Sequence, residues 1–426
     1  MKILVIGSGG REHAICWKLA QSLHAPALYC APGNAGIAEI ATCLLADVND
    51  AGSLANLAAS IGADLTVVGP EAPLVAGAAE AFRAQSLRVV GPSRAAAQLE
   101  GSKIFAKQFM ARHSIPTAQF TACHSPESAR AALELEFKFP VVVKADGLAA
   151  GKGVRIASDE REFEEAINAM MVEGVFGEAG SRIVLEECLV GREASLMIFT
   201  DGRDYKAIVP AQDYKRVFDG DWGPNTGGMG SFSTPGLIDD ATLARITREI
   251  VEPTLRGMAA EDNSFAGVLY TGLMLTENGP KVIEYNARMG DPETQAVLVR
   301  LESDLVEIFE AIVDGEIGSA SVSWGDASSV CVVAASGGYP GAFEKGKHIA
   351  GLDEAKSLEG VAVFHAGTTG DGRGGFLTSG GRVLGVTALA ATLEEARARA
   401  YAAVSRISFD GMHYRKDIAG GNAQAC

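Results

Sequence analysis

The stretch Val141-Val-Val-Lys-Ala-Asp-Gly-Leu-Ala-Ala-Gly-Lys-Gly-Val154 decides which nucleotide-binding fold this chain can adopt. A P-loop has four residues between its first glycine and a Gly-Lys pair, and then Ser or Thr at the start of a helix. Here three residues separate Gly147 from Gly151-Lys152, and an apolar strand pattern follows. The stretch is instead typical of a β-hairpin whose glycines expose N–H groups, while Lys144 and Lys152 add charge. We expect a lid that closes over a triphosphate, with a plain structural hairpin as the alternative.

The residues before this stretch have the pattern of a parallel α/β domain. Residues 2–6 form an apolar strand pattern that runs into Gly7-Ser-Gly-Gly10 and then into a helical pattern at 11–22. Two more apolar strands, at 65–68 and 88–90, end in Gly-Pro dipeptides, and Ala-rich helical patterns occupy 51–61 and 76–86. Strands that alternate with helices predict a parallel sheet.

The first glycine loop almost matches a dinucleotide-binding fingerprint. Glu12 stands where the fingerprint has its third glycine, and the second strand, at 27–31, ends without an acidic residue for a ribose. We therefore expect no nicotinamide cofactor. N–H groups at a helix N-terminus, with Arg11 beside them, still attract a phosphate, although a tight turn without a ligand is an equal alternative.

From about residue 100 the strands come in pairs, which predicts antiparallel sheets. Residues 141–145 with 153–157, and 183–187 with 193–200, are expected to form hairpins, and Asn278-Gly279 is a strong turn signal between two further strands. An apolar strand at 329–335 and a helix at 393–406 follow. The fold class that we predict is a multidomain α/β and α+β chain. Its parts are a parallel α/β domain (1–101), a central domain with antiparallel sheets (102–296) and a lid (about 123–191), a helical linker (297–326) and a small C-terminal α+β domain (327–426).

Glu284 and Asn286 lie two apart on a predicted strand, so their side chains point to the same face. A carboxylate and an amide oxygen suffice to hold Mg²⁺ beside ATP, because this ion prefers oxygen ligands and keeps several waters. A solvated face is the usual alternative for such a pattern. Arg288-Met-Gly-Asp-Pro-Glu293 follows directly and adds a guanidinium and two carboxylates, and a guanidinium can clamp a phosphate. The sequence therefore predicts a metal and phosphate site here.

Residues 211–230 read as a long connection without regular structure. They begin with Ala211-Gln-Asp-Tyr-Lys-Arg216 and end with Asp219-Gly-Asp-Trp-Gly-Pro-Asn-Thr-Gly-Gly-Met-Gly230. A segment of this length is uncommon inside a compact domain unless it serves a site. We expect it to line a binding site.

Composition and charge exclude several classes of protein. The formal net charge of −16 disfavours non-specific nucleic-acid binding, because no excess of cations is available to displace counterions. The seven cysteines are scattered without a C-x-x-C pair, which fits reduced thiols rather than a disulfide framework or a zinc site. No stretch approaches 18 apolar residues, and the apolar run at 3–6 is too short for a signal peptide. We expect a cytoplasmic protein with no nucleic-acid or membrane partner.

Taken in order, the motifs resemble the phosphoribosylamine-glycine ligase family of ATP-grasp enzymes over nearly the whole chain. The segment 211–230, the Lys144 lid, the Glu284-Tyr-Asn286 strand and Gly290-Asp-Pro-Glu-Thr-Gln295 carry this resemblance. Further matches are Gly7-Ser-Gly-Gly-Arg-Glu-His13, Pro32-Gly-Asn-Ala-Gly36, Gly69-Pro-Glu71, Gly101-Ser-Lys103, Gly380-Gly-Arg-Val-Leu-Gly-Val386 and Tyr414-Arg-Lys-Asp417. Met289, Tyr214 and the tail after Ile418 depart from the family pattern, which leaves the role of position 214 open.

The resemblance implies a reaction and a role for each motif. The central domain is then an ATP-grasp domain, and the reaction joins glycine to 5-phosphoribosylamine with ATP and Mg²⁺ or Mn²⁺, through glycyl phosphate. ATP is assigned to Lys103, Lys144, Gly151, Lys152, Gly153, Glu186, Glu187, Leu189 and Glu193. The metal is assigned to Glu284 and Asn286, the glycine ammonium to Asp213, and the transferred phosphoryl to Arg288. The ribosylamine is assigned to Gly9, Gly10, Arg11, Glu12, Gly33, Asn34, Glu71, Asp291, Pro292 and Glu293.

Two other functions stay open at this point. Another ATP-grasp ligase or carboxylase would have a similar lid and metal strand, although the segment 211–230 argues against it. A non-catalytic nucleotide sensor is a second possibility, which the lysines, the metal pair and Arg288 disfavour. The lability of phosphoribosylamine also makes transient contact with the enzyme that supplies it an attractive hypothesis.

Overall fold

The N-terminal part of the chain forms a five-stranded parallel sheet. The computed structural model describes residues 1–149, 153–421 and 424–425. The strands β1 (Lys2–Gly7), β2 (Ala27–Pro32), β3 (Thr42–Cys43), β4 (Leu65–Val68) and β5 (Val89–Val90) lie in the order β3-β2-β1-β4-β5, and each neighbouring pair is parallel. The helices of this part are α1 (Gly10–Leu19), α2 (Ala51–Ile61), α3 (Glu71–Val75) and α4 (Ala78–Ala84). The predicted parallel sheet is confirmed, and β1 is buried on both faces from Ile3 onward, as such strands are.

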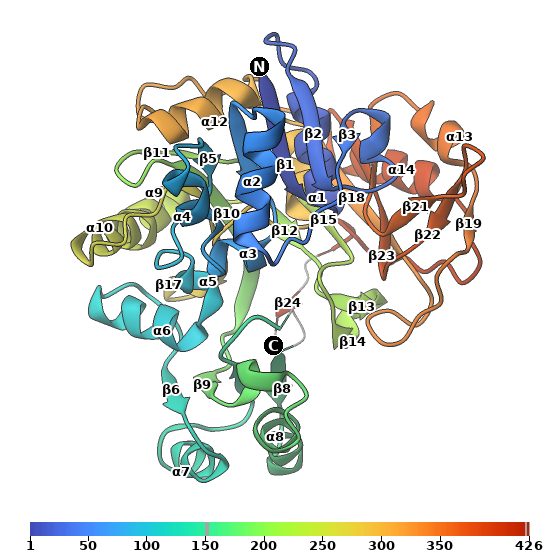
Figure 1. The fold of residues 1–426 in the computed structure, drawn as a ribbon. Helices are drawn as coiled ribbons and strands as arrows, with labels where there is room; N and C mark the ends of the chain where they lie inside the picture. Colours follow the sequence, from blue (N-terminus) through green and yellow to red (C-terminus); the bar gives the residue numbers. More distant parts are fainter. Residues whose placement is uncertain (150–152, 422–423, 426) are drawn as a thin grey trace.

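A second body, at the bottom of Figure 1, contains the two strands of the predicted lid hairpin. Its four strands, β6 (Phe120–Cys123), β7 (Val141–Ala145), β8 (Val154–Ala157) and β9 (Ile183–Glu187), lie in the antiparallel order β6-β9-β7-β8. The helices α7 (Pro126–Glu136) and α8 (Glu160–Ile167) pack against this sheet through a separate apolar cluster that includes Phe163 and Ile167. The predicted hairpin of 141–145 with 153–157 is confirmed as β7–β8.

The predicted hairpin of 183–187 with 193–200 is wrong. Strand β9 lies between β6 and β7, so both of its edges are occupied and none is left for the next strand. The chain instead passes into another antiparallel sheet, β11-β10-β16-β17. Its strands are β10 (Gly191–Thr200), β11 (Tyr205–Ala207), β16 (Gly267–Thr276) and β17 (Gly279–Asn286). The expected hairpin around Asn278 is confirmed as β16–β17, and β24 (Gln424–Ala425) pairs with the start of β10.

Residues 211–230 are more regular than the sequence suggested. They contain β12 (Gln212–Asp213) and a small ribbon of β13 (Arg216–Phe218) with β14 (Trp222–Asn225), and they lead into β15 (Gly230–Ser233). The expectation of an irregular loop is therefore wrong, because each strand is too short to show an apolar period. Strands β12 and β15 extend the C-terminal sheet in the order β12-β15-β18-β23-β20.

The C-terminal part packs beside the N-terminal sheet (Figure 1). Its main strands are β18 (Ser328–Ala335), β20 (Val361–His365) and β23 (Arg382–Ala390), and helix α14 (Leu393–Val404) packs on β18 and β23. The small sheet β19-β22-β21 and helix α13 complete it, with β19 (His348–Ile349), α13 (Leu352–Lys356), β21 (Thr368–Gly370) and β22 (Phe376–Thr378). Helices α11 (Glu293–Leu298) and α12 (Leu305–Asp314) connect this part to the central sheets.

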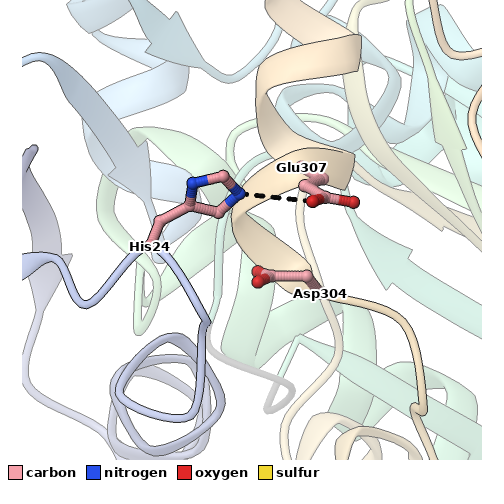
Figure 2. Close-up of side chains that lie close together, drawn as sticks. All are labelled: His24, Asp304 and Glu307. Carbon is pink, nitrogen blue, oxygen red and sulfur yellow. Dashed lines mark hydrogen bonds and ion pairs between the residues drawn. The ribbon is translucent and has the colours of Figure 1, made fainter.

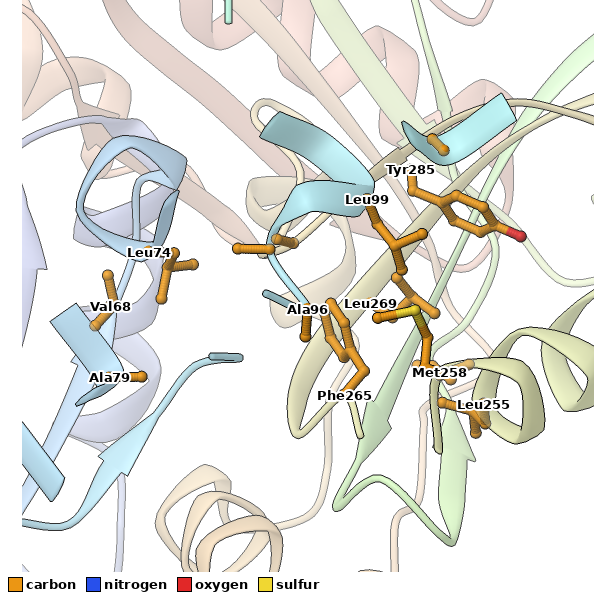
Figure 3. Close-up of a cluster of buried hydrophobic side chains, with 14 of the residues drawn as sticks. Val68, Leu74, Ala79, Ala96, Leu99, Leu255, Met258, Phe265, Leu269 and Tyr285 are labelled. Atoms are coloured by element: carbon orange, nitrogen blue, oxygen red, sulfur yellow. The ribbon is translucent and has the colours of Figure 1, made fainter. Parts of the chain in front are cut away.

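One apolar core joins the N-terminal part to the central sheet (Figure 3). Val68, Leu74 and Ala79 of the N-terminal part and Leu269 and Tyr285 of the central sheet belong to the same cluster of buried side chains. The remaining helices of this region are α5 (Gln98–Gly101), α6 (Lys103–Arg112), α9 (Asp240–Ile246) and α10 (Glu252–Ala260). Because the two parts share a core, the N-terminal loops are held at a fixed place beside β17. In the described ranges, no helix combines the length and the apolar character that crossing a membrane requires.

Candidate active site

A cavity of about 780 Å³ lies where the N-terminal, central and C-terminal parts meet. Most of the side chains that the sequence singled out line it, although they come from distant parts of the chain. These residues are Arg11, Glu71, Lys103, Lys144, Gly153, Glu186, Glu187, Leu189, Glu193, Asp213, Glu284, Asn286, Arg288, Asp291 and Glu293. Six others are not among the described lining residues: Gly9, Gly10, Glu12, Gly33, Asn34 and Pro292. Gly151 and Lys152 lie outside the described residues.

One end of the cavity is rich in lysine, and we call Lys103, Lys107, Lys144 and Glu186 the lysine end. The ammonium groups of Lys107 and Lys144 lie 2.8 and 3.0 Å from the same oxygen of Glu186, and all three side chains are buried. Lys144 also donates to the carbonyl of Ile283 at 3.2 Å, and Lys103 donates to that of Gly147 at 3.4 Å. Lys107 and Lys144 therefore share one carboxylate, and with Lys103 beside them the four side chains leave a net positive charge for an anionic ligand.

Burial shifts the pKa values of the lysines at the lysine end, whereas the neighbouring lysines determine the pKa of Glu186. It lowers the pKa of Lys107 to about 8, although Glu186 opposes the shift, and it lowers the pKa of Lys103 as well. For Glu186 burial acts in the opposite sense, but Lys107 and Lys144 outweigh it and lower the pKa of this carboxyl. Glu186 is therefore ionised at neutral pH, and the lysines share it as their counter-ion.

A second group of side chains in the same cavity is rich in carboxylates, and we call Asp213, Glu193, Glu284, Glu293 and Lys215 the carboxylate end. The ammonium of Lys215 lies 3.5 Å from Glu193 and 3.6 Å from Glu284. Glu293 is 3% exposed and accepts a hydrogen bond from the hydroxyl of Tyr270 at 2.9 Å. Four carboxyl groups around one lysine leave a shortage of positive charge.

This shortage appears in the pKa values. Burial raises the pKa of Asp213 to about 8, against Lys215, and Glu293 and Glu193 add to the rise. Burial also acts on Glu284, but Lys215, Lys103 and Lys144 lower the pKa of that carboxyl to about 2. Of these two acids, Glu284 stays ionised, while Asp213 takes up a proton unless a cation arrives.

Strand β17 presents Glu284 and Asn286 to the cavity, as their spacing predicts. The hydrogen-bond surroundings of Asn286 place its amide nitrogen 3.1 Å from the carbonyl of Tyr285 and 3.0 Å from Glu100. The amide oxygen is then on the side away from those acceptors. A carboxylate and an amide oxygen are hard donors that fit a divalent ion with several waters, so the donor set fits the metal that the fold class uses.

Arg288 lines the same cavity and is held by two carboxylates. It donates to Glu100 at 2.7 Å and to Glu71 at 3.2 Å. Burial raises the pKa of Glu100 to about 7, although Arg288 opposes the shift. Burial would also raise the pKa of Glu71, but Arg288 and Arg11 lower it to about 2. Arg288 is thus fixed in one orientation by these two ion pairs.

The N-terminal loop packs against the segment after β17 and fixes it. Arg11 donates to the carbonyl of Met289 at 3.2 Å and to Glu12 at 2.6 Å, and Glu12 also accepts from the N–H of Gly9 at 2.5 Å. A Cβ at Gly10 would meet the side-chain amide of Gln295 at 2.5 Å, so a larger residue here would require that side chain to move. The carboxylate of Glu12 is used within its own loop. Its contact with the ribosylamine therefore stays a prediction.

The side chain of Asn34 is also used within the protein. Its amide nitrogen donates to the carbonyls of Ser8 and His365 at 2.8 Å each, and its oxygen accepts from the N–H groups of Gly36 and Ile37. Asn34 thereby ties two N-terminal loops to strand β20 of the C-terminal part. Its predicted role in binding also stays untested.

Sequence reasoning missed four charged groups of this site. Lys107 lies one helical turn after Lys103 on α6, and this spacing could have revealed it. Lys215 stands in the quoted segment 211–216 but received no role. Arg382 stands in the quoted motif 380–386 but also received no role, and it forms an ion pair of 3.0 Å with Asp291. Glu100 gave no local signal.

A separate cluster of polar side chains lies away from this cavity. Figure 2 shows His24, Asp304 and Glu307, whose side-chain atoms lie within 4.8 Å of one another. Asp304 caps helix α12 by accepting from the N–H of Val306 at 2.9 Å, and its other oxygen accepts from Ser22 at 2.7 Å. These contacts explain the cluster as a helix cap and a surface ion pair, and we assign no metal to it.

Comparisons with known proteins identify the family of this chain. The N domain, the ATP-grasp (A) domain and the C domain of phosphoribosylglycinamide synthetase match residues 1–100, 101–294 and 329–421. A phosphoribosylamine–glycine ligase of Caldanaerobacter subterraneus subsp. tengcongensis is 48% identical, over 99% of this chain and 100% of the relative. One from Vibrio cholerae is 49% identical, over 98% of this chain and 97% of the relative.

A solved structure has the same fold over the full length. The crystal structure of phosphoribosylamine–glycine ligase from Thermotoga maritima matches with a TM-score of 0.84 at 35% identity, and the match covers 98% of this chain and 100% of that one. The resemblance that the motifs indicated is confirmed by these matches. The chain therefore belongs to the phosphoribosylamine–glycine ligase family of ATP-grasp ligases.

Proposed function

We propose that the protein joins glycine to 5-phosphoribosylamine and converts ATP to ADP and phosphate, the glycinamide ribonucleotide step of de novo purine biosynthesis. The observation that carries this proposal is the opposite charge of the two ends of one cavity. ATP brings several negative charges, whereas glycine brings an ammonium group and the reaction requires a divalent ion. The relatives named above bear the name of this reaction.

In the first step a carboxylate oxygen of glycine attacks the γ-phosphorus of ATP. The O–P bond of glycyl phosphate forms, the bond to the β,γ-bridging oxygen breaks, and ADP leaves. Lys103, Lys107 and Lys144 supply fixed positive charge to the phosphates, and Glu186 is the shared counter-ion of Lys107 and Lys144. Fixed charges in a site that excludes water stabilise the spreading negative charge better than water does.

In the second step the amine of phosphoribosylamine attacks the acyl carbon of glycyl phosphate. The C–N bond forms, the C–O bond to the phosphoryl group breaks, and the phosphate that leaves carries the proton lost by the amine. Arg288 lies where it can bind the acyl phosphate oxygens, since two carboxylates hold it in one orientation. Arg11, Glu71, Asp291 and Arg382 line the side of the cavity that we assign to the ribosylamine.

Glycine binds at the carboxylate end in this proposal. Its ammonium group replaces the proton that Asp213 otherwise holds, because a buried carboxyl among other acids ionises only when a cation neutralises it. Lys215 lies next to this place, between Glu193 and Glu284. Its ammonium would then lie near the oxygens that are exchanged between glycine and the γ-phosphoryl group.

Glu284 and Asn286 would hold the divalent ion, which we propose to be Mg²⁺ or Mn²⁺. When bound, such an ion neutralises phosphate oxygens and orients the triphosphate. Glu284 is ionised, and the amide oxygen of Asn286 faces away from its protein acceptors, so both donors are ready for the ion.

The first experiment is ADP release from ATP and Mg²⁺ with glycine, with and without phosphoribosylamine generated in place. We expect release only when both substrates are present, and glycinamide ribonucleotide in the mass spectrum. Release with other acid and amine pairs, but not with this pair, would leave the ATP-grasp class intact and reject the substrates. The cytoplasmic location and the transient contact with the supplying enzyme remain part of the proposal; complete loss of coupled flux when free intermediate is scavenged would reject direct transfer.

A further inference from the structure

Lys215 belongs to a segment that the C-terminal tail holds from outside the cavity. Its carbonyl accepts hydrogen bonds from the N–H and the hydroxyl of Thr226, at 2.8 and 2.9 Å, at the base of the β13–β14 ribbon. From this base the side chain reaches Glu193 and Glu284. The two neighbours in sequence, Tyr214 and Arg216, both contact residue 415. The place of the Lys215 ammonium therefore depends on what holds this short stretch of backbone.

Arg415 makes these contacts with a guanidinium that is 0% exposed. It donates to Asp221 on the ribbon side at 2.6 Å and to the carbonyl of Arg216 at 3.1 Å. It also forms a two-pronged pair with Asp417, at 2.7 and 2.5 Å. The guanidinium carbon lies 4.8 Å from the centre of the Tyr214 ring. The planar guanidinium of Arg415 thus contacts the residues on both sides of Lys215, Tyr214 and Arg216.

Further hydrogen bonds join the same two segments. The N–H of Lys416 donates to Asp219 at 2.7 Å, and the N–H of Gly220 donates to Asp417 at 2.8 Å. A ring nitrogen of His413 lies 2.8 Å from the carbonyl of Val217. The hydroxyl of Tyr214 accepts from the N–H of Ala419 at 3.0 Å, which gives this residue a packing role. The ribbon is therefore attached to residues 413–419 along its length.

A buried ion pair of this kind is weak evidence for stability, because desolvation offsets most of the attraction. Its planar fork is better suited to fixing geometry, since several hydrogen bonds must be satisfied together. A lysine side chain is flexible, so its ammonium is placed only if its backbone is fixed. A misplacement of about 1 Å in a catalytic site can reduce the rate about 10²-fold.

We propose that Arg415 is a positioning residue for the reaction: it holds residues 214–216 so that the ammonium of Lys215 lies between Glu193 and Glu284. This inference rests on the proposed function, in which Lys215 lies beside the reacting oxygens. Arg415 acts from the C-terminal part and touches no substrate. The C-terminal part thereby contributes to catalysis through a residue outside the cavity.

The test is a double-mutant cycle of Arg415→Lys with Lys215→Met, read as kcat and as the KM of ATP and of glycine. Arg415→Lys keeps the charge and removes the fork, and we expect a fall in kcat of about tenfold or more with little change in the KM of ATP. If Arg415 acts through Lys215, the double variant is no slower than Lys215→Met within about twofold. Two independent losses that multiply would overturn the inference.

The matched control is Arg399→Lys, which changes a C-terminal arginine that donates to the carbonyl of Leu389 and lies away from the ribbon. It should leave kcat unchanged even if it lowers the melting temperature. If Arg415→Lys does not fold, Asp221→Asn takes its place in the cycle, since it leaves the pair of Arg415 with Asp417 intact. Turnover of the wild-type enzyme tests the proposed reaction separately from the role of Arg415. If the wild type ligates another pair of substrates, the proposed reaction is wrong, and the double-mutant cycle is run with that pair.

Discussion

The lysine end and the carboxylate end of the cavity carry opposite net charge. At the lysine end Lys107 and Lys144 share Glu186, and at the carboxylate end four acids surround Lys215. The lysine end comes from helix α6 and the lid sheet, whereas the carboxylate end comes from β10, β12, β17 and α11. The difference teaches that the two ends favour ligands of opposite charge.

The same comparison explains why binding at the carboxylate end should depend on pH. At the lysine end Glu186 already provides a counter-ion, so the lysines stay buried without a ligand at a moderate cost. At the carboxylate end Asp213 takes up a proton instead. Arrival of a cation there must release that proton, which links glycine binding to pH.

The largest effect is expected from Glu284→Ala, which removes the only carboxylate of the proposed metal pair. We expect kcat/KM to fall on the order of 10²–10³-fold, because charge on the phosphoryl oxygens loses its stabilisation. Steady-state ADP release at ordinary Mg²⁺ measures this. Glu277→Ala, at an exposed position on the same hairpin, is the control. Near wild-type turnover of the Glu284 variant with an intact fold would refute the metal role.

At the lysine end, Lys144→Met should reduce kcat/KM for ATP about 10–10²-fold, since it also leaves Glu186 with one fewer partner. The glycine KM should change little, because glycine binds at the other end. Lys138→Met, an exposed lysine on the same part of the chain, serves as the control. Equal changes in the KM of ATP and in the KM of glycine would contradict the assignment of the two substrates to different ends of the cavity.

At the carboxylate end, Asp213→Asn should raise the glycine KM about tenfold or more, with a much smaller change in the KM of ATP. The amide cannot neutralise the ammonium group of glycine. Asp240→Asn, at the exposed start of α9, is the matched control. A variant in which the KM of ATP rises as much as that of glycine would count against this placement of glycine.

The same substitution should stabilise the ligand-free protein. Since the pKa of Asp213 rises from 3.8 to about 8 on folding, the native state keeps a proton that the unfolded state releases. Stability from this group is therefore lost as pH rises between these two values. The melting temperature of Asp213→Asn relative to wild type should increase from pH 5 to pH 8 and level off above it. A constant difference across this range would show that Asp213 is ionised throughout.

The smallest effect is expected from Glu100→Gln, next to the metal pair. Glu100 orients Asn286 and Arg288, and the glutamine keeps one acceptor for them. We expect Mn²⁺ affinity, measured by electron paramagnetic resonance with ADP present, to weaken about 3–10-fold, at the low end for a residue behind a ligand. Glu134→Gln on the exposed lid surface is the control. An unchanged Mn²⁺ affinity in Glu100→Gln would show that Glu100 does not support the metal site.

The sequence predicted those features that depend on local patterns. The β7–β8 hairpin, the shared face of Glu284 and Asn286, and the parallel N-terminal sheet follow from spacing and turn residues. The partner of β9 did not follow, because strand pairing is a choice among distant segments. For the same reason the roles of Glu100, Arg382 and Arg415 did not follow from the sequence: their contacts join residues about a hundred or more apart in the chain.

The central claim is that the two ends act on one reaction, in which a glycine oxygen takes the γ-phosphoryl group. The most direct measurement uses glycine with ¹⁸O in both carboxylate oxygens and follows the label by mass spectrometry in a single turnover. The account predicts one ¹⁸O in the released phosphate and one in the amide carbonyl of glycinamide ribonucleotide. Phosphate without the label would contradict it, because ATP would then have been cleaved without transfer to glycine.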